Sequence, residues 1–204
     1  TALNYHSYGN LLIHPYGYQV GLLPPEPDIS LFRYYGNLMT AENQYLMGTG
    51  IETVGYTVNG EACDWMYETH GIFAYTPEIG TATDGFWPAT DRIVPLAQEN
   101  LLPNKLIAHF AGAYYQPEII QNPAQPLLSG ATVQLELQLT NKGLSASDGN
   151  VLVSLEDAYQ NNQSFNVGDL ASQAIGSYDV EWQVPVLESG SEWPVTIMVQ
   201  DQSG

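Results

Sequence analysis

Basic residues are scarce in this sequence. Its 204 residues contain four Lys and Arg against 22 Asp and Glu, which gives a formal net charge of −18. Nucleic-acid binding depends on clustered Lys and Arg that neutralise phosphates, whereas Arg33, Arg92, Lys105 and Lys142 are scattered along the chain. The sequence therefore excludes nucleic acid as a partner and disfavours an anionic membrane surface. A surface this acidic suits an extracytoplasmic or secreted setting, which we expect for this protein.

Cysteine and long apolar runs are also scarce. Cys63 is the only cysteine, so the chain cannot form an internal disulfide. No run of about 18 apolar residues is present, so no membrane span is predicted. Residues 1–8 have the pattern of a strand within a domain and no signal peptide is seen, so we expect the chain to begin partway through a larger protein.

Two parts with different patterns follow one another along the chain. Residues 1–116 mix strand and helix signals, whereas residues 117–204 contain only strand and turn signals, with apolar side chains at every second position of 133–139. Period-two alternation is typical of half-buried strands. We therefore predict an α/β domain, with a partial mixed sheet and helices, followed by an all-β sandwich. The seam is expected near 116–126, where prolines cluster.

Apolar periodicity predicts the main elements of the first part. Gly71 is expected to close a short helix, and Pro103 is expected to kink a long one. The predicted elements are helices over 29–46, 64–69 and 91–113, and a buried strand over 72–79.

Three segments of the first part have a recognisable order and spacing. YHSYG at 5–9 leads to HPYGY at 14–18, GYTVNG at 55–60 leads to CDWMY at 63–67, and FAYTPEIG occupies 73–80. Together they resemble the C-terminal half of the catalytic domain of the M14-type zinc carboxypeptidases, the carboxypeptidase A-like family. The resemblance runs from Leu3 to about His109, roughly half of the chain.

The resemblance implies a zinc-dependent carboxypeptidase in which five residues have roles. His6 matches a zinc ligand, and Glu78 matches the carboxylate that takes a proton from water and passes it to the leaving amine. Tyr56 matches the mobile tyrosine that closes over the terminal carboxylate of the substrate, and Tyr8 matches a residue lining the substrate subsites. Cys63 matches the floor of the pocket for the C-terminal side chain. Because cysteine packs as a small apolar residue, it predicts a neutral or apolar C-terminal residue.

The rest of the family's catalytic apparatus is not found in this sequence. A catalytic zinc takes three protein ligands, and the family's other two lie on a His-x-x-Glu segment. None of the four histidines here is followed by Glu three residues later. The resemblance therefore implies one zinc ion with its other ligands upstream, in a missing N-terminal half of the catalytic domain. It implies a peptide or protein C-terminus as substrate, and a fragment that is inactive by itself. It also implies non-proline cis peptides at Ser7–Tyr8 and Pro15–Tyr16.

Other functions remain open from the sequence. The strand, the turn at 141–143 and the next strand resemble adhesion-type immunoglobulin-like modules appended to secreted bacterial enzymes. In one alternative this module binds protein, glycan or a cell surface, and the first part is a degenerate peptidase scaffold. In another, the second part is a purely structural appendage.

The remaining ionisable side chains of the first part are interpreted as structural or solvated. His70 lies beside a predicted helix end, where a partly charged imidazole is favourable. The structural histidines are His14, His70 and His109, and the residues expected on a solvated acidic face are Glu42, Glu52, Glu61 and Glu68.

Overall fold

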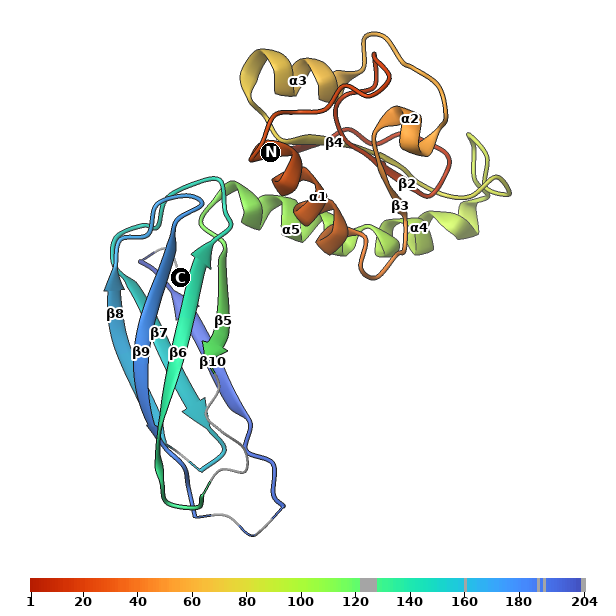
Figure 1. Ribbon diagram of the computed structural model, residues 1–204. Helices are drawn as coiled ribbons and strands as arrows, with labels where there is room; N and C mark the ends of the chain where they lie inside the picture. Colours follow the sequence, from red (N-terminus) through yellow and green to blue (C-terminus); the bar gives the residue numbers. More distant parts are fainter. Residues whose placement is uncertain (122–127, 160, 187, 189, 203–204) are drawn as a thin grey trace. The chain divides into compact units, whose positions relative to one another are not determined.

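The computed structural model describes residues 1–121, 128–159, 161–186, 188 and 190–202 (Figure 1). The chain divides into two units, Thr1–Phe110 and Ala111–Gly204. This division comes before the boundary expected at 116–117, because Tyr115–Gln121 (β5) pairs with a strand of the second unit. The part of the expected seam at 122–127 lies outside the described residues.

The first unit is built on a mixed four-stranded sheet in the order β1-β4-β2-β3 (Figure 1). β1 runs parallel to β4, β2 runs antiparallel to β4, and β3 runs parallel to β2. The prediction of a mixed α/β fold for this part is confirmed. Its elements are β1 (Ala2–Leu3), β2 (Leu11–Ile13), α1 (Asp28–Met39), β3 (Leu46–Gly48), α2 (Gly50–Thr53), α3 (Ala62–His70), β4 (Ala74–Glu78), a 3-10 helix (Thr90–Arg92), α4 (Ile93–Glu99) and α5 (Leu101–Ala111).

Aromatic side chains make up a large part of the core of the first unit. Phe32 and Tyr35 of α1 are fully buried. Phe32 stacks on Phe73, with ring centroids 4.4 Å apart, and Tyr35 stacks on Phe110 at 4.2 Å. The Tyr75 hydroxyl donates a 2.8 Å hydrogen bond to the Phe32 carbonyl, which satisfies the polar end of a buried ring. These contacts hold α1 against β4 and α5, and so fix the strand that carries Glu78.

The first predicted helix is shorter than expected. The pattern over 29–46 predicts one continuous helix, but α1 ends at Met39. The Thr40 hydroxyl and backbone N–H both donate to the Gly36 carbonyl at the end of the helix. The following segment returns to the sheet as β3, where Leu46 donates to the Asn10 carbonyl. Pairing with a distant strand therefore overrides a local helical pattern here.

The last predicted helix is divided at a different residue from the one expected. The prediction for 91–113 places a kink at Pro103, whereas the helix breaks at Asn100, between α4 and α5. The Asn100 amide donates to the Leu96 carbonyl at 2.9 Å and to the Tyr45 hydroxyl at 3.3 Å. Pro103 lies in the first turn of α5, where the missing N–H would have no partner within the helix. The proline is therefore accommodated without a kink of its own.

Several local predictions for the first unit are confirmed. The strand expected at 72–79 is present as β4. α3 ends at Gly71, whose φ of 64° is in the left-handed region that glycine adopts without strain. The peptide bonds Ser7–Tyr8 and Pro15–Tyr16 are both cis.

The second unit consists of two three-stranded antiparallel sheets, in the orders β5-β6-β9 and β10-β7-β8 (Figure 1). Its buried core takes side chains from both sheets, including Leu137 of β6, Val153 of β7 and Trp182 of β9. The strands after β5 are β6 (Thr132–Asn141), β7 (Val151–Asp157), β8 (Asn162–Gly168), β9 (Ile175–Gln183) and β10 (Val195–Gln200). Across the described part of the whole chain, no helix is long and apolar enough to cross a membrane.

Candidate active site

The end of β4 holds Glu78 next to His6. The His6 backbone N–H donates to the Pro77 carbonyl at 2.9 Å, and the Ile79 N–H donates to the His6 carbonyl at 3.0 Å. These two bonds form an isolated parallel bridge between His6 and Glu78. On the side chains, Oε1 of Glu78 lies 3.9 Å from Nδ1 of His6. The structure therefore brings together the two residues for which the sequence suggests metal-binding and proton-transfer roles.

Burial controls the charge state of Glu78. Its side chain is 17% exposed. Burial raises the pKa of Glu78, the nearby His6 lowers it in part, and the negative charge of Glu61 raises it further. A carboxylate with a raised pKa holds a proton more readily, which is the property required of a general base that later acts as an acid.

The structure permits His6 to serve as one zinc ligand. Its imidazole is half exposed, and the Asn4 amide nitrogen lies 3.0 Å from Nε2, which leaves Nδ1 on the side of Glu78. A catalytic zinc takes three protein ligands. Among the described residues, only Glu61, Cys63 and Asp64 form a group of three potential ligand side chains, and His6 is not part of it. A zinc ion at His6 therefore requires further ligands from beyond the residues described.

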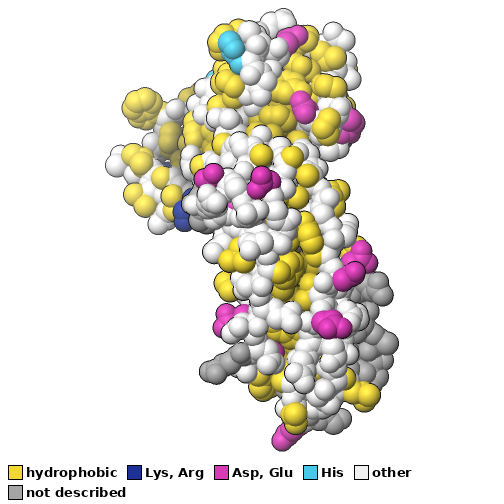
Figure 2. Space-filling view, turned by 90° about the vertical axis from the view of Figure 1, so that its left-hand side faces the viewer, with side chains coloured by type: hydrophobic (Ala, Val, Ile, Leu, Met, Phe, Trp, Pro, Cys, Tyr) yellow, Lys and Arg dark blue, Asp and Glu magenta, His cyan; other side chains and the backbone are white. Residues whose placement is uncertain are grey.

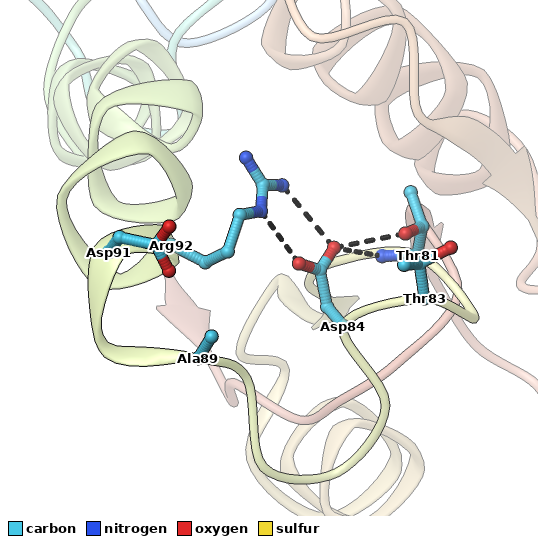
Figure 3. A pocket seen from close by; sticks show the side chains of 6 residues that line it. All are labelled: Thr81, Thr83, Asp84, Ala89, Asp91 and Arg92. Carbon is cyan, nitrogen blue, oxygen red and sulfur yellow. Dashed lines mark hydrogen bonds and ion pairs between the residues drawn. The ribbon is translucent and has the colours of Figure 1, made fainter.

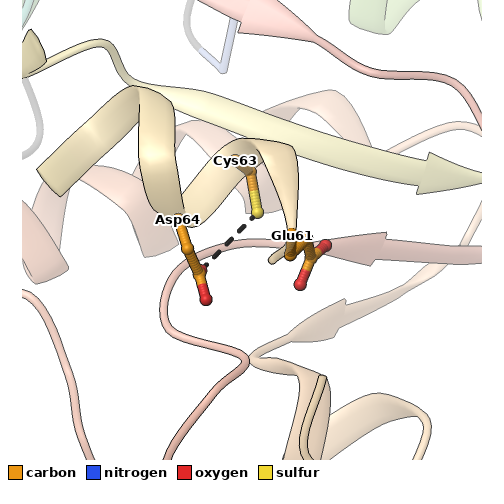
Figure 4. Close-up of side chains that lie close together, drawn as sticks. All are labelled: Glu61, Cys63 and Asp64. Atoms are coloured by element: carbon orange, nitrogen blue, oxygen red, sulfur yellow. Dashed lines mark hydrogen bonds between the residues drawn. The ribbon is translucent and has the colours of Figure 1, made fainter. Parts of the chain in front are cut away.

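The start of α3 gathers Glu61, Cys63 and Asp64 (Figure 4). Their nearest ligand atoms all lie within 4.8 Å of one another. The Gly17 N–H donates to both carboxylate oxygens of Asp64, at 2.9 and 3.1 Å. The Cys63 thiol is fully buried, with Sγ 3.8 Å from Oδ1 of Asp64.

The two buried side chains of this group have raised pKa values. Burial raises the pKa of Asp64 to about 6; the hydrogen bond from Gly17 works against the rise, and the charge of Glu61 adds to it. Burial also raises the pKa of the Cys63 thiol far above its ordinary value, and Glu61 and Asp64 add to that rise. Cys63 is therefore a neutral thiol at physiological pH, and not a nucleophilic thiolate.

The other predicted substrate residues occupy different environments. Tyr8 is 38% exposed, and its ring meets that of Phe86 edge-on, with centroids 5.0 Å apart. Tyr56 is 61% exposed and lies in the connection between α2 and α3. Cys63, in contrast, is enclosed at the start of α3. The resemblance implies that Tyr8, Tyr56 and Cys63 surround one substrate. Their contacts in this structure do not test those roles, which stay predictions.

The interpretation of Glu61 as part of a solvated acidic face is wrong. Glu61 is half buried, and its Oε2 is shielded from solvent near the Cys63 thiol. Thr76, which the sequence does not single out, is also buried, and its hydroxyl lies beside the Cys63 thiol. Two features of the sequence point to these residues. Glu61 immediately precedes the helix that carries Cys63, and Thr76 shares a strand face with Glu78.

The loop after β4 encloses a cavity of about 340 Å³ lined by Thr81, Asp84, Ala89 and Arg92, among others (Figure 3). Its polar groups already pair with one another. Arg92 Nε donates to Asp84 Oδ1 at 2.6 Å, and the Thr81 N–H and hydroxyl donate to Asp84 Oδ2 at 2.9 and 3.0 Å. Arg92 holds the pKa of Asp84 well below its usual value. The contacts among Thr81, Asp84 and Arg92 close the loop on itself.

Comparison with known proteins gives a consistent result for the first unit. The sequence model of the zinc carboxypeptidase family matches residues 1–103. Mast cell carboxypeptidase A from Homo sapiens is 30% identical over 112 residues, a match that covers 53% of this chain and 27% of that protein. Carboxypeptidase A1 from Bos taurus is 31% identical over 110 residues, covering 49% of this chain and 25% of that protein. The chain thus spans about a quarter of the length of these curated relatives.

A solved structure also aligns with about half of the chain. The crystal structure of thrombin activatable fibrinolysis inhibitor aligns with a TM-score of 0.44 at 26% sequence identity. The alignment covers 52% of this chain and 28% of that one.

Proposed function

This chain belongs to the zinc carboxypeptidase family, and from this premise we propose that it forms part of a metallocarboxypeptidase that removes C-terminal residues from peptides. The observation that carries the proposal is the pairing of His6 with Glu78, whose side chains approach to 3.9 Å at the end of β4. A half-exposed imidazole beside a partly buried carboxylate suits metal-assisted hydrolysis of an amide. When bound, zinc supplies a Lewis acid and lowers the pKa of a coordinated water.

Glu78 is the proposed proton carrier. Its carboxylate accepts a proton from the attacking water and then donates it to the leaving amine. Burial raises the pKa of Glu78, which is the direction that favours accepting a proton. His6 is the proposed metal ligand of this chain, and the Asn4 amide nitrogen lies 3.0 Å from its Nε2.

Tyr56 and Tyr8 are proposed to contact the substrate. Tyr56 is exposed and lies between Gly55 and Gly60, which have φ values of 81° and 80°. Glycines on either side of a short segment let it change conformation at low cost. This supports closure of Tyr56 over the terminal carboxylate of a bound peptide. Tyr8, anchored by Phe86, would line the approach to His6.

The second unit is proposed to be an immunoglobulin-like β-sandwich module attached to the catalytic part. The support is its two three-stranded antiparallel sheets and the core to which both contribute. An extracytoplasmic or secreted location is also part of the proposal, and the net charge of −18 supports it.

Zinc content and peptide hydrolysis, measured on the natural protein that carries this sequence, test the proposal. We expect about one zinc ion per molecule and hydrolysis of a blocked peptide. Glu78→Gln should retain zinc and lower kcat by roughly 100-fold or more, because it removes the general base. His6→Ala should lose both zinc and activity. Glu118→Gln, an exposed substitution in the second unit, is the matched control.

Absence of zinc and of hydrolysis in the natural protein would contradict the proposal. The first unit would then be a degenerate scaffold, and a binding role for the second unit would be the better account.

A further inference from the structure

We propose that Asn59 is a site of spontaneous covalent modification, at which its side chain cyclises onto the Gly60 nitrogen and then hydrolyses to aspartate or isoaspartate. Asn59 lies in the connection between α2 and α3, the segment that also carries Tyr56. The modification itself does not depend on the proposed function. Its expected effect on substrate binding does rest on that function, because Tyr56 is proposed to close over the terminal carboxylate of the substrate.

The residue that follows Asn59 favours this reaction. Asn59 and Gly60 form the only Asn-Gly pair in the sequence. The reaction requires the main-chain nitrogen of the second residue to reach the side-chain carbonyl carbon of the first. A side chain on the second residue hinders that approach, whereas glycine has none and tolerates the backbone rotation that it needs. A Cβ placed on Gly60 would meet nothing beyond its chain neighbours within 4 Å, so the surroundings leave room for the movement.

The structure leaves both reacting groups free. Asn59 and Gly60 are exposed. Within the described part of the chain, neither the Asn59 side-chain amide nor the Gly60 N–H takes part in a hydrogen bond. Held residues flank the pair, because the Val58 N–H donates to the Gly17 carbonyl at 3.0 Å and α3 begins at Ala62. The pair can therefore reach the reactive geometry without breaking a hydrogen bond of the fold.

Comparable positions elsewhere in the chain are restrained. Asn141 is fully buried, and both the oxygen and the nitrogen of its side chain are hydrogen-bonded. A glycine also follows Asp84, but both oxygens of this carboxylate accept hydrogen bonds from Arg92. Asn150 is exposed, but the next residue is Val151, whose branched side chain hinders approach to its nitrogen. Exposure, an unbonded amide and a following glycine thus coincide at Asn59.

Water is the only co-reactant that the reaction needs. The Gly60 nitrogen loses its proton to solvent and attacks the side-chain carbonyl carbon of Asn59. The new C–N bond closes a succinimide ring, and the bond to the side-chain nitrogen breaks, so that this nitrogen leaves with a proton from solvent as ammonia. Water then adds to one of the two ring carbonyls and opens the ring. The products are aspartate, or isoaspartate, in which the main chain runs through the former side chain, and no atom is oxidised or reduced.

Either product adds a negative charge to the segment that carries Tyr56. An aspartate with a pKa of about 3.9 is ionised at neutral pH. The protein already has a net charge of −18, and Figure 2 shows Asp and Glu spread over a face where Lys and Arg are scarce. A further carboxylate beside Tyr56 repels the terminal carboxylate of a peptide substrate. Isoaspartate also lengthens the main chain of the segment by a methylene group, which changes the path along which Tyr56 closes.

Mass spectrometry of the natural protein, digested after storage in mildly alkaline buffer, tests the modification. We expect the peptide that contains Asn59 to gain about 1 Da, the difference between an amide and a carboxyl group. An isoaspartyl methyltransferase should label the same peptide. The gain should be at least about tenfold slower in mildly acidic buffer, because the attacking nitrogen must lose a proton. Asn59→Gln should abolish the gain, since the longer side chain would have to close a larger ring, and Asn150→Gln is the matched control that should leave it unchanged.

Hydrolysis of a blocked peptide measures the consequence for the substrate. Asn59→Asp supplies one of the two products directly. It should raise KM by about two- to fivefold with little change in kcat, because an exposed like charge weakens binding of the substrate and of the transition state equally. Asn59→Gln should keep the KM of the unmodified protein.

The two measurements separate the modification from the proposed function. A peptide with Asn59 that gains no mass, or a gain that survives Asn59→Gln, would overturn the modification site. The same KM in Asn59→Asp and in the unmodified protein would overturn its effect on substrate binding. If even the unmodified protein hydrolyses no peptide, the proposed function is overturned, and the mass gain still decides whether Asn59 is modified.

Discussion

At the residue scale, two neighbouring carboxylates at the start of α3 have different partners. Asp64 is 5% exposed, and both of its oxygens accept the Gly17 N–H. Glu61 faces the same glycine, and one of its oxygens is shielded from solvent beside the Cys63 thiol. A carboxylate whose hydrogen bonds are made within the protein has a structural role. The bonds from Gly17 therefore assign Asp64 to the framework at the start of α3.

Asp64 should make the protein less stable as the pH rises from about 4 to about 6. Burial raises its pKa to about 6 in the folded state, against about 3.9 in the unfolded chain. The stability gained by protonating Asp64 is complete below the unfolded pKa and is lost as the pH rises through the folded one. The difference between the two pKa values corresponds to about 3 kcal/mol at most.

Urea unfolding between pH 4 and pH 7 measures this effect. The loss of unfolding free energy between about pH 4 and about pH 6 should disappear in Asp64→Asn. It should remain in Glu68→Gln. The same pH profile in Asp64→Asn and in the unmodified protein would show that Asp64 ionises normally.

At the element scale, the loop that follows β4 is held by one ion pair. Arg92 donates hydrogen bonds to both carboxylate oxygens of Asp84, with Nη2 3.3 Å from Oδ2. Asp84 also accepts a hydrogen bond from the Thr81 N–H (Figure 3). The Asp84 side chain is 6% exposed, so its charge would be poorly solvated without the arginine. The same loop carries Phe86, which packs on Tyr8. The ion pair between Arg92 and Asp84 therefore contributes to the position of Tyr8, a proposed substrate-binding residue.

Arg92→Ala should loosen this loop without unfolding the unit. The Thr81 amide hydrogen, which bonds to Asp84, should exchange with solvent at least about tenfold faster, because local opening no longer breaks an ion pair. Hydrogen exchange read by NMR or mass spectrometry gives the measurement. Arg33→Ala is the control, since Arg33 and Glu52 are both about half exposed and their 3.4 Å contact is a surface pair. Unchanged exchange at Thr81 would show that the backbone alone holds the loop.

At the scale of the whole molecule, acidic charge is the dominant property. Four Lys and Arg are too few to compensate 22 Asp and Glu, so most carboxylates repel one another. Such self-repulsion keeps a protein soluble but destabilises its compact state. Each of the two units nevertheless has its own buried core, aromatic in the first and mainly aliphatic in the second.

Salt should therefore stabilise this protein. Raising NaCl from about 0.01 M to about 0.5 M shortens the screening length from roughly 30 Å to less than 10 Å, and we expect the unfolding temperature to rise by a few degrees. Calorimetry in NaCl and in KCl checks the result, because screening depends on ionic strength and not on the identity of the cation. An unfolding temperature that falls with added salt would mean that attractive ion pairs outweigh the repulsion.

Much of the fold was already determined by local sequence. Gly71 marked the end of α3 because a left-handed residue there favours glycine. The apolar run at 72–79 became β4, and alternation over 133–139 became part of β6. The three segments at 5–18, 55–67 and 73–80, each a local motif, together identified the zinc carboxypeptidase family. These features depend on residues close together in the chain, which is the information that periodicity and motifs contain.

Only the tertiary structure decided where helices stop and which polar groups are enclosed. The helix predicted over 29–46 ends at Met39 because the next segment pairs with β2. Glu61 looks like an ordinary surface residue in the sequence, and its environment depends on Gly17, which lies far from it along the chain. Burial and the pairing of charges are properties of segments that meet in space. The sequence therefore identified the family and the candidate residues His6 and Glu78, whereas the fold revealed that the carboxylate of Glu61 is partly enclosed beside Gly17.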